Sequence, residues 1–441
     1  MPYNPAMPAA GVSQVERQLV RAIGVPGLAA NIINTTVGAS IFVLPAPVAK
    51  NLGPAAPLAF ILCAIAMTMF ATCFALAGSR VSLTGGPYAY IEVAFGNYAG
   101  FLAGVIYFLM ALLAMAAVTS VLVGAIVALV PALEGNAWRT ILTFLIYAFL
   151  VVVNVRGVEW GARVVTITTA IKLCPLLLFI AVGLFSIKLS ALAPEAWPNA
   201  KSLGESVFLL LFAFFGIEIG LVPSGEVRDP ARTVPRAIYV ALIIIALLYI
   251  LIQLVAQGTL GPRLAEHSET PLAEAASSFL GTFGRLLLLG AATVSAFGGV
   301  TSNILSSPRI LFALGRDGIL PRIFAHVHRR FQSPDVAICA FATLGLVLSL
   351  SSRFESLAIM ANVAALLLYA LCCAASWELM RRDVRLEAPP FYFKGARIFP
   401  LISIGLIIWL LAHATNHEWF LTAVVLALAS LLYGLRRLSM R

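Results

Sequence analysis

The sequence predicts an all-α membrane protein with twelve transmembrane helices, and three observations support this fold class. The chain has 441 residues, of which 61% are hydrophobic and only 11% are charged. A soluble protein of this length would need far more charged surface. Apolar stretches of about 20 residues, long enough to cross a bilayer as a helix, recur over most of the length. Two of these stretches are interrupted near their middle.

Short polar loops connect the twelve predicted helices, without a soluble domain. The predicted helices cover 22–49, 54–78, 97–130, 139–155, 162–186, 203–226, 235–257, 283–313, 335–351, 355–378, 397–413 and 418–435. Residues 1–18 are polar and rich in Pro, with no apolar core that would serve as a cleaved signal peptide. We therefore expect a multi-pass protein of the cytoplasmic (inner) membrane, with an N-terminal tail at 1–18 and a C-terminal tail at 436–441.

The 29 Lys and Arg residues, which give a formal net charge of +10, are distributed unevenly. If the N-terminus is inside, 21 of them fall on the inner side of the predicted helices, seven fall on the outer side, and Lys172 lies within a helix. Such a bias sets the orientation of helical membrane proteins. It predicts that both termini are cytoplasmic, and it explains the positive charge without a nucleic-acid partner.

The first ten helices divide into two halves, 19–186 and 203–378, and an interrupted helix opens each half. Because each half has an odd number of helices, the second half must enter the membrane from the opposite side, which makes the halves an inverted repeat. Residues 397–435 supply two accessory helices outside the repeat. Interruptions at corresponding positions of two such halves are typical of secondary transporters, whose substrates bind there.

The first interruption is the segment Thr35–Phe42. Lipid offers no partners to exposed backbone groups, so a broken helix persists only where it lines a cavity or binds a ligand. The inner half-helix would end near Thr36 with unpaired carbonyl groups, which suit an ammonium group. The outer half-helix would begin near Ser40, and its free N–H groups suit a carboxylate. The residues expected to bind substrate here are Thr35, Thr36, Gly38, Ala39, Ser40 and Ile41.

The second interruption is the segment Phe212–Glu218. It would direct carbonyl groups of Phe212, Ala213 and Phe215 into the same space, and Gly216 would provide the open backbone. Donors for an anion and acceptors for a cation would then lie close together, which is the charge pattern of an α-amino acid. The alternative is a pair of glycine kinks filled by neighbouring side chains.

Two ionisable residues lie deep within predicted helices, where an unpaired charge is costly. Glu218 follows Gly216 by two residues and could bind a proton, contact a cationic substrate or hydrogen-bond another helix. Lys172 lies nine residues beyond Arg163, or about 13–14 Å of helix, which is too deep for its side chain to reach the surface easily. It could replace a bound cation and couple transport to a proton gradient. Alternatively, it is a lysine that carbonyl groups satisfy and that does not titrate.

The sequence predicts no cofactor and no metal site. The six cysteines lie within or at the ends of apolar stretches, and none forms a CxxC pair. Neither His413 with His417 nor His326 with His328 is expected to have acidic or thiol partners, so metal binding is not expected. A membrane-embedded enzyme would need His, Asp or Cys residues clustered around one cavity, and no such cluster is evident.

Four ordered motifs resemble those of the amino acid–polyamine–organocation superfamily of permeases, over residues 19–369. The segments that carry the likeness are Val37–Ala46, Phe212–Glu218 followed by Gly225–Ala237, Gly85–Tyr90 with Phe95 and Gly96, and Arg309 with Gly315–Pro321. Two positions depart from the family pattern. Ser40 replaces the third glycine of the first motif, and Asp229 replaces an Asn before Pro.

The resemblance implies the LeuT-type fold of five-plus-five inverted repeats, with discontinuous first and sixth helices, and transport by alternating access. It implies substrate binding at the two interruptions, with Phe212 as an aromatic gate over the ligand. Lys172 matches the lysine that sodium-independent members have in the fifth helix. Compared with arginine/agmatine exchangers, the gating residue is Phe rather than Trp, and a polar position of the third helix becomes Met115. Both differences favour a small or apolar substrate side chain.

We therefore expect a secondary active amino acid transporter, a proton symporter or an exchanger, that does not depend on sodium. Its expected partners are the substrate, protons and membrane lipid. The alternative is a polyamine or cationic amino acid antiporter in which Glu218 meets the substrate charge directly. A non-transporting amino acid sensor would require an extra soluble domain.

Overall fold

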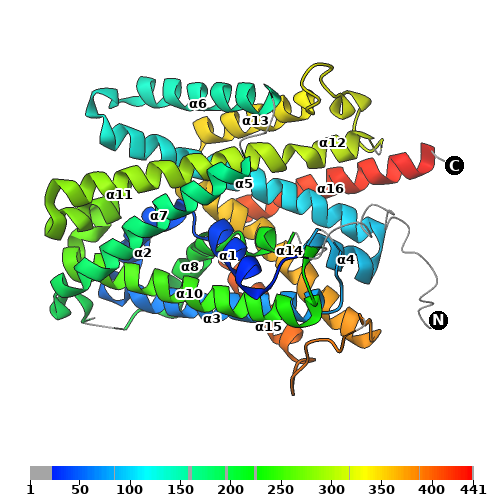
Figure 1. Ribbon diagram of the computed structural model, residues 1–441, viewed down its shortest axis with the longest axis horizontal. Helices are drawn as coiled ribbons and strands as arrows, with labels where there is room; N and C mark the ends of the chain where they lie inside the picture. Colours follow the sequence, from blue (N-terminus) through cyan, green and yellow to red (C-terminus); the bar gives the residue numbers. More distant parts are fainter. Residues whose placement is uncertain are drawn as a thin grey trace.

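The computed structural model describes residues 22–83, 85–156, 161–193, 197–222, 226–316, 318–386 and 388–439. Within these ranges the ordered elements are helices, and the β-type pairing is a single isolated bridge between Ile23 and Val227. Most of the long helices run side by side along the long axis of the molecule (Figure 1). The all-α prediction is confirmed for this part of the chain.

The helices follow the predicted apolar stretches closely. The first part of the chain forms α1 (Val25–Thr36), α2 (Pro45–Leu52), α3 (Ala56–Gly78), α4 (Pro87–Phe95), α5 (Asn97–Leu129), α6 (Asn136–Arg156) and α7 (Gly161–Gly183). The second part forms α8 (Ala200–Leu210), α9 (Ile217–Gly220), α10 (Pro230–Leu260), α11 (Pro271–Ser306), α12 (Pro308–Arg316), α13 (Asp335–Ser351), α14 (Phe354–Arg381), α15 (Phe399–Leu411) and α16 (Asn416–Ser439). Several begin with Pro, such as Pro87, Pro230 and Pro271. Pro suits this position because the first helical N–H would be unpaired anyway.

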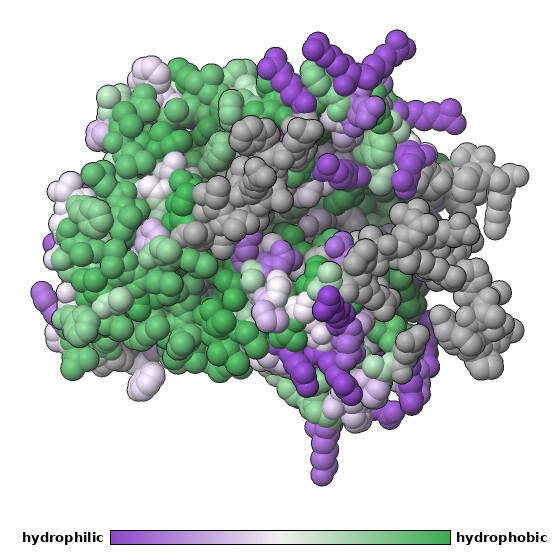
Figure 2. All heavy atoms as spheres, in the orientation of Figure 1, coloured by the Kyte–Doolittle hydropathy of each residue, from purple (hydrophilic) through white to green (hydrophobic). Residues whose placement is uncertain are grey.

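The surface has the character of a membrane protein. Eight helical stretches within the described ranges have the length and the hydropathy to cross a membrane, and Ile171–Ser186, Asp335–Ser351 and Phe399–Leu411 are shorter apolar helices. On the face shown in Figure 2, apolar side chains cover a broad belt, and charged side chains gather towards one end. Phe144 and Phe149 of α6 are 57% and 56% exposed, as expected of side chains that contact lipid. The chain is a multi-pass membrane protein.

One end of the bundle, which we call the basic end, holds the start of α10 and the ends of α3 and α14. At this end Arg80 Nη1 donates to the carbonyl oxygen of Val384 at 3.0 Å. The start of α1 lies at the same end, because Ile23 N donates to Glu226 O at 3.0 Å and Arg228 N donates to Ile23 O at 2.9 Å. These bonds tie the segment before α1 to the segment that follows α9.

Both predicted interruptions are present. α1 ends at Thr36, Val37 is extended with ψ 90°, and a 3-10 turn at Ser40–Phe42 precedes α2. α8 ends at Leu210 and is followed by a 3-10 turn at Leu211–Phe214. Gly216 then adopts φ 115°, which only Gly takes readily. The helix resumes as the single turn α9 and ends at Gly220, whereas the sequence predicted helix as far as residue 226.

The sequence missed a helical stretch between the predicted helices 235–257 and 283–313. α11 begins at Pro271 and is broken at Gly281, where φ is 61° and ψ is −151°, so the helix after the break starts close to the predicted residue 283. The residues before the break include Glu274, which accepts a hydrogen bond from Arg285 Nε at 2.9 Å. This ion pair bridges the break. Its two charges interrupt the apolar pattern on which the prediction was based.

The close contact at Gly216 can be tested by substitution. A Cβ added there would lie 2.3 Å from the carbonyl oxygen of Thr35, in a backbone conformation that side chains avoid. Such backbone strain costs on the order of 1–3 kcal/mol, and the clash adds to it. Gly216→Ala should therefore lower the melting temperature of the purified protein in detergent. Gly405→Ala in α15, where nothing lies within 4 Å of the added Cβ, is the matched control. Equal melting temperatures for the two variants would contradict the contact.

Candidate functional site

Four consecutive backbone amides of the first interruption have no partner among the described residues. The N–H groups of Val37 and Phe42 are hydrogen-bonded, but those of Gly38–Ile41 between them donate to no described residue. An added Cβ at Gly38 would have only the carbonyl oxygen of Thr36 within 4 Å, so the segment borders open space. Buried amides normally have a partner. A run of free amides at the start of a helical turn is suited to binding an anion.

The carbonyl groups at the end of α1 are bonded by side chains of two other helices. Lys172 Nζ of α7 donates to Asn34 O at 2.6 Å. The hydroxyl of Tyr249, from α10, lies 3.1 Å from Thr36 O and 2.9 Å from Ala213 O. One buried hydroxyl thus lies between the two interruptions. Lys172 stabilises the negative end of the α1 dipole, as a cation at a helix C-terminus does.

The two interrupted helices also touch directly. Thr35 Oγ1 lies 2.8 Å from Gly216 O, and Asn31 Nδ2 donates to Gly220 O at 2.9 Å. Thr36 Oγ1 is buried and has no hydrogen-bond partner among the described residues. A buried hydroxyl without a partner loses the energy of solvation. The Thr36 side chain therefore adds an unused polar atom beside the unpaired amides.

Each carboxylate oxygen of Glu218 accepts a hydrogen bond from within the protein. Oε1 accepts a hydrogen bond from Gly216 N at 3.0 Å, and Oε2 accepts one from the Tyr369 hydroxyl of α14 at 2.8 Å. The side chain is only 1% exposed. Of the roles considered from the sequence, the geometry shows the helix-to-helix hydrogen bond, because both oxygens are used within the protein.

Phe212 is covered from the end opposite to the basic end. Its side chain is 4% exposed. Its ring meets Phe354, the first residue of α14, edge to face with 5.7 Å between centroids, and lies 5.2 Å from the ring of Phe215. Aromatic pairs at these separations are favourable. The three rings form an apolar wall beside the second interruption.

Met115 is not brought to the interruptions. It is fully buried in a separate cluster with Tyr147 of α6, and its methyl group lies beside Gly345 of α13. The face of α5 that meets the interruptions instead carries Ala117, which packs in a cluster with Phe212. Val118 borders this cluster, the cluster of Ala39 and that of Met115. The other predicted substrate-binding residues lie on the two interruptions. The predicted proton-coupling residues, Lys172 and Glu218, hydrogen-bond to Asn34 and Gly216 beside them.

Three residues at this site were not identified from the sequence: Tyr249, Tyr369 and Phe354. The first two gave a usable signal, because a tyrosine in the middle of an apolar helix must find a partner for its hydroxyl. Phe354 gave none, since Phe is common in membrane helices.

The prediction for His326 was wrong, because its Nδ1 lies 2.7 Å from the acidic side chain of Asp335, at Oδ1. Even so, no group of three or more His, Cys, Asp or Glu in the described ranges could hold a metal ion.

The bridging role of Tyr249 predicts a local effect of removing its hydroxyl. Tyr249→Phe leaves two buried carbonyl groups without this donor, at a cost of about 1–3 kcal/mol. Amide hydrogen exchange in peptides covering 35–42 and 211–216 should therefore speed up by about 5- to 150-fold. Tyr98→Phe, which removes an exposed hydroxyl bonded to Ser430, should leave both peptides unchanged. If Tyr249→Phe also left them unchanged, the hydroxyl would not join the interruptions.

Comparison with known proteins agrees with this architecture. A family model described as amino acid permease matches residues 23–430. The methylthioribose transporter of Bacillus subtilis is 27% identical over 427 residues, covering 91% of this chain and 90% of its own length. From the same organism, the serine/threonine exchanger SteT is 26% identical (85% and 86% covered), and the branched-chain amino acid permease BcaP is 27% identical (95% and 92% covered). The chain belongs to the amino acid permease family, whose members are membrane transporters rather than enzymes.

Proposed function

We propose that this protein is a secondary active amino acid transporter whose substrate binds between the two interruptions. The run of unpaired amides at Gly38–Ile41 carries the proposal. These amides would bind the substrate carboxylate, and Thr36 Oγ1 beside them is a further polar group for the ligand. Carbonyl groups of Thr35, Phe212 and Phe215 would receive the ammonium group. The names of two relatives, a serine/threonine exchanger and a branched-chain permease, support an amino acid substrate.

The proposed fold has twelve crossings in the LeuT-type arrangement. Residues 19–186 and 203–378 form the inverted repeats, and 397–435 form the accessory helices. The direct contact of α1 with α9 supports this arrangement, because it pairs the two interrupted helices. The clustering of Arg and Lys at the basic end supports cytoplasmic termini in the inner membrane, by the positive-inside tendency.

The occupied carboxylate of Glu218 favours a neutral substrate. A cationic side chain would have to compete with Gly216 N and the Tyr369 hydroxyl, which already donate to the two carboxylate oxygens. Ala117, Phe212 and Phe215 offer an apolar surface instead. We therefore place proton exchange, rather than substrate charge, at Glu218. Protonation of Oε2 would require the Tyr369 hydroxyl to turn from donor to acceptor.

Lys172 gives a route by which proton state could control α1. While the ammonium group is charged, its bond to Asn34 O fixes the end of α1 against α7. Loss of the proton would weaken this charge-assisted bond and free the α1 terminus. The same ammonium group occupies the carbonyl end of α1, where a metal cation would otherwise bind, which supports transport without sodium.

In an alternating-access cycle, each end of the molecule would open in turn. At the end opposite to the basic end, the contact between Phe212 and Phe354 would have to separate. At the basic end, the bonds that tie Ile23 to Glu226 and Arg228 would move or break. Neither movement requires the helices to unwind further, because the interruptions already supply the hinges.

Uptake into proteoliposomes tests the proposed function. Neutral amino acids such as serine and leucine should accumulate, and putrescine or arginine should compete poorly. Gly38→Val should abolish uptake, because its side chain enters the open space beside the amides. Its melting temperature should stay close to that of wild type, since little lies near the added Cβ. Gly405→Val is the control. Selective uptake of putrescine or arginine would favour the antiporter alternative. Uptake that is unchanged in Gly38→Val would contradict the proposed substrate site.

Proton coupling is tested at Lys172. Lys172→Ala should abolish the stimulation of uptake by an imposed pH gradient. Gradient-driven uptake should fall at least about tenfold, because a hydrogen bond from a charged group contributes about 1.5–3 kcal/mol. Lys201→Ala is the control, since Lys201 is exposed at the start of α8 and its ion pair with Glu205 is 4.0 Å long. Gradient-driven uptake that survives in Lys172→Ala would remove Lys172 from the coupling mechanism.

A further inference from the structure

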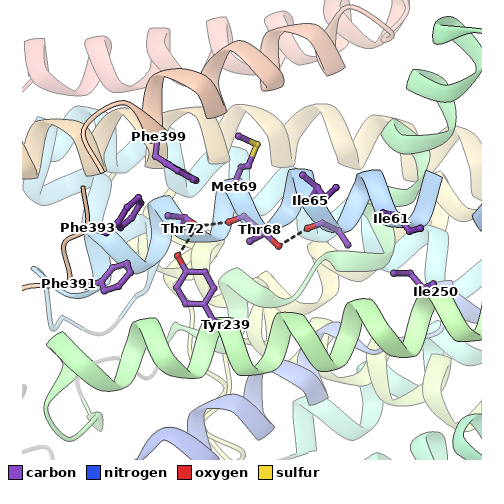
Figure 3. A pocket seen from close by; sticks show the side chains of 11 residues that line it. Ile61, Ile65, Thr68, Met69, Thr72, Tyr239, Ile250, Phe391, Phe393 and Phe399 are labelled. Atoms are coloured by element: carbon purple, nitrogen blue, oxygen red, sulfur yellow. Dashed lines mark hydrogen bonds between the residues drawn. The ribbon is translucent and has the colours of Figure 1, made fainter. Parts of the chain in front are cut away.

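A groove separate from the interruptions opens on the surface between α3, α10 and α15. We call it the α3–α10 groove. It has a volume of about 700 Å³, and Ile61, Ile65 and Met69 of α3 lie along one wall, opposite Ile250 of α10 (Figure 3). Ile61 and Ile65 are exposed, so the groove is open to the surroundings of the protein. In a multi-pass membrane protein those surroundings are lipid.

The walls suit an apolar occupant. The hydroxyls of Thr72 and Tyr239 lie 2.9 Å apart, and Thr72 and Thr68 each donate to a backbone carbonyl one turn earlier in α3. These hydroxyls thus satisfy one another or the helix (Figure 3). Elsewhere the lining is mostly aliphatic and aromatic. A groove of this size lies within the range of about 300–1,000 Å³ that is typical of sites for small ligands.

The loop between α14 and α15 closes one end of the groove and brings positive charge to it. Phe391 and Phe393 of this loop, and Phe399 at the start of α15, point towards the groove (Figure 3). Lys394 follows Phe393 directly, and Arg397 precedes Phe399 by two residues. Both cations are exposed. The end of the groove at the basic end is therefore an aromatic rim, and two exposed cations are close neighbours of its phenylalanines in the sequence.

Lys394 and Arg397 differ from the other cations of this region because they form no salt bridge within the described chain. Arg385 Nε donates to Asp383 Oδ1 at 2.8 Å, and this bond lowers the pKa of the Asp383 carboxyl group, so both partners stay ionised. Arg381 is paired with Glu378 in the same way, at 2.7 Å. The charge of Arg397 also lowers the pKa of the Asp383 carboxyl group, but neither Arg397 nor Lys394 forms an ion pair within the described chain, so the rim keeps positive charge available for an anionic partner.

We propose that the α3–α10 groove binds an anionic phospholipid. One acyl chain lies along Ile61, Ile65 and Met69, and the phosphate group is bound by Lys394 and Arg397. The position of the cations at the membrane-facing rim favours a lipid headgroup, because juxtamembrane cations attract anionic lipids. Bound lipid would contact α10 at Tyr239, ten residues or about 15 Å of helix from Tyr249. The lipid would therefore contact the helix whose hydroxyl lies between the two interruptions.

Native mass spectrometry of the purified full chain tests the headgroup. The probe is an equimolar mixture of phosphatidylglycerol and phosphatidylcholine with identical acyl chains. Wild type should retain phosphatidylglycerol preferentially. Lys394→Gln with Arg397→Gln should weaken its retention by about fivefold for each cation removed and leave phosphatidylcholine unchanged. Arg329→Gln with Arg330→Gln, which removes two exposed cations from the loop before α13, is the matched control. Equal retention of both lipids by wild type, or equal losses in the two double variants, would overturn the proposal.

A second variant tests the acyl-chain site. Thr68→Trp places a large ring in the groove and should reduce retention of phosphatidylglycerol, whereas Leu344→Trp on the lipid-facing side of α13 should not. Unchanged retention in Thr68→Trp would show that the groove does not hold the chain. Melting temperatures confirm folding of each variant, and if Thr68→Trp fails to fold, Ile65→Phe fills the same wall. These measurements need no transport activity, so their outcome does not depend on the proposed function.

Discussion

The structure depends on the close approach of two unwound backbone segments inside a membrane protein. The carbonyl oxygen of Thr35 lies so near Gly216 that no side chain fits between them. Backbone groups freed in this way must find partners, because lipid supplies none. Lys172, Tyr249 and the Glu218–Tyr369 pair supply most of them from the surrounding helices. The four amides of Gly38–Ile41 and the Thr36 hydroxyl have no partner among the described residues, and this makes them a candidate binding site.

Much of the fold could be predicted from the sequence, and the reason is physical. Apolar stretches of membrane-spanning length predict helices. Gly38 and Gly216 predict the positions of the two breaks, because no residue around them gives another reason for the helix to be interrupted. The partners of the breaks could not be predicted in the same way. Tyr249 and Thr36 are 213 residues apart, and Lys172 and Asn34 are 138 residues apart. Nothing local in the sequence signals contacts over such separations.

The misplacement of Met115 has a related cause. α5 is apolar on every side, so the sequence gives no preferred face, and a shift of two residues moves a side chain from one side of the helix to another. The structure turns Ala117 towards Phe212 and Met115 towards α6 and α13. Glu218 shows the opposite case. Its position was predicted correctly, but its two hydrogen-bond partners decide which of its chemical roles is open.

Recognition through main-chain amides has a consequence for how such a protein can diversify. Every amino acid except proline carries the same N–H group, so substitutions at Ala39–Ile41 can change the nearby side chains without removing the donors. The common part of every α-amino acid would remain recognised while residues such as Ala117, Val118 and Phe215 change freely. New cargo preferences could then arise by altering a few contact positions, with the binding of the shared head group inherited intact.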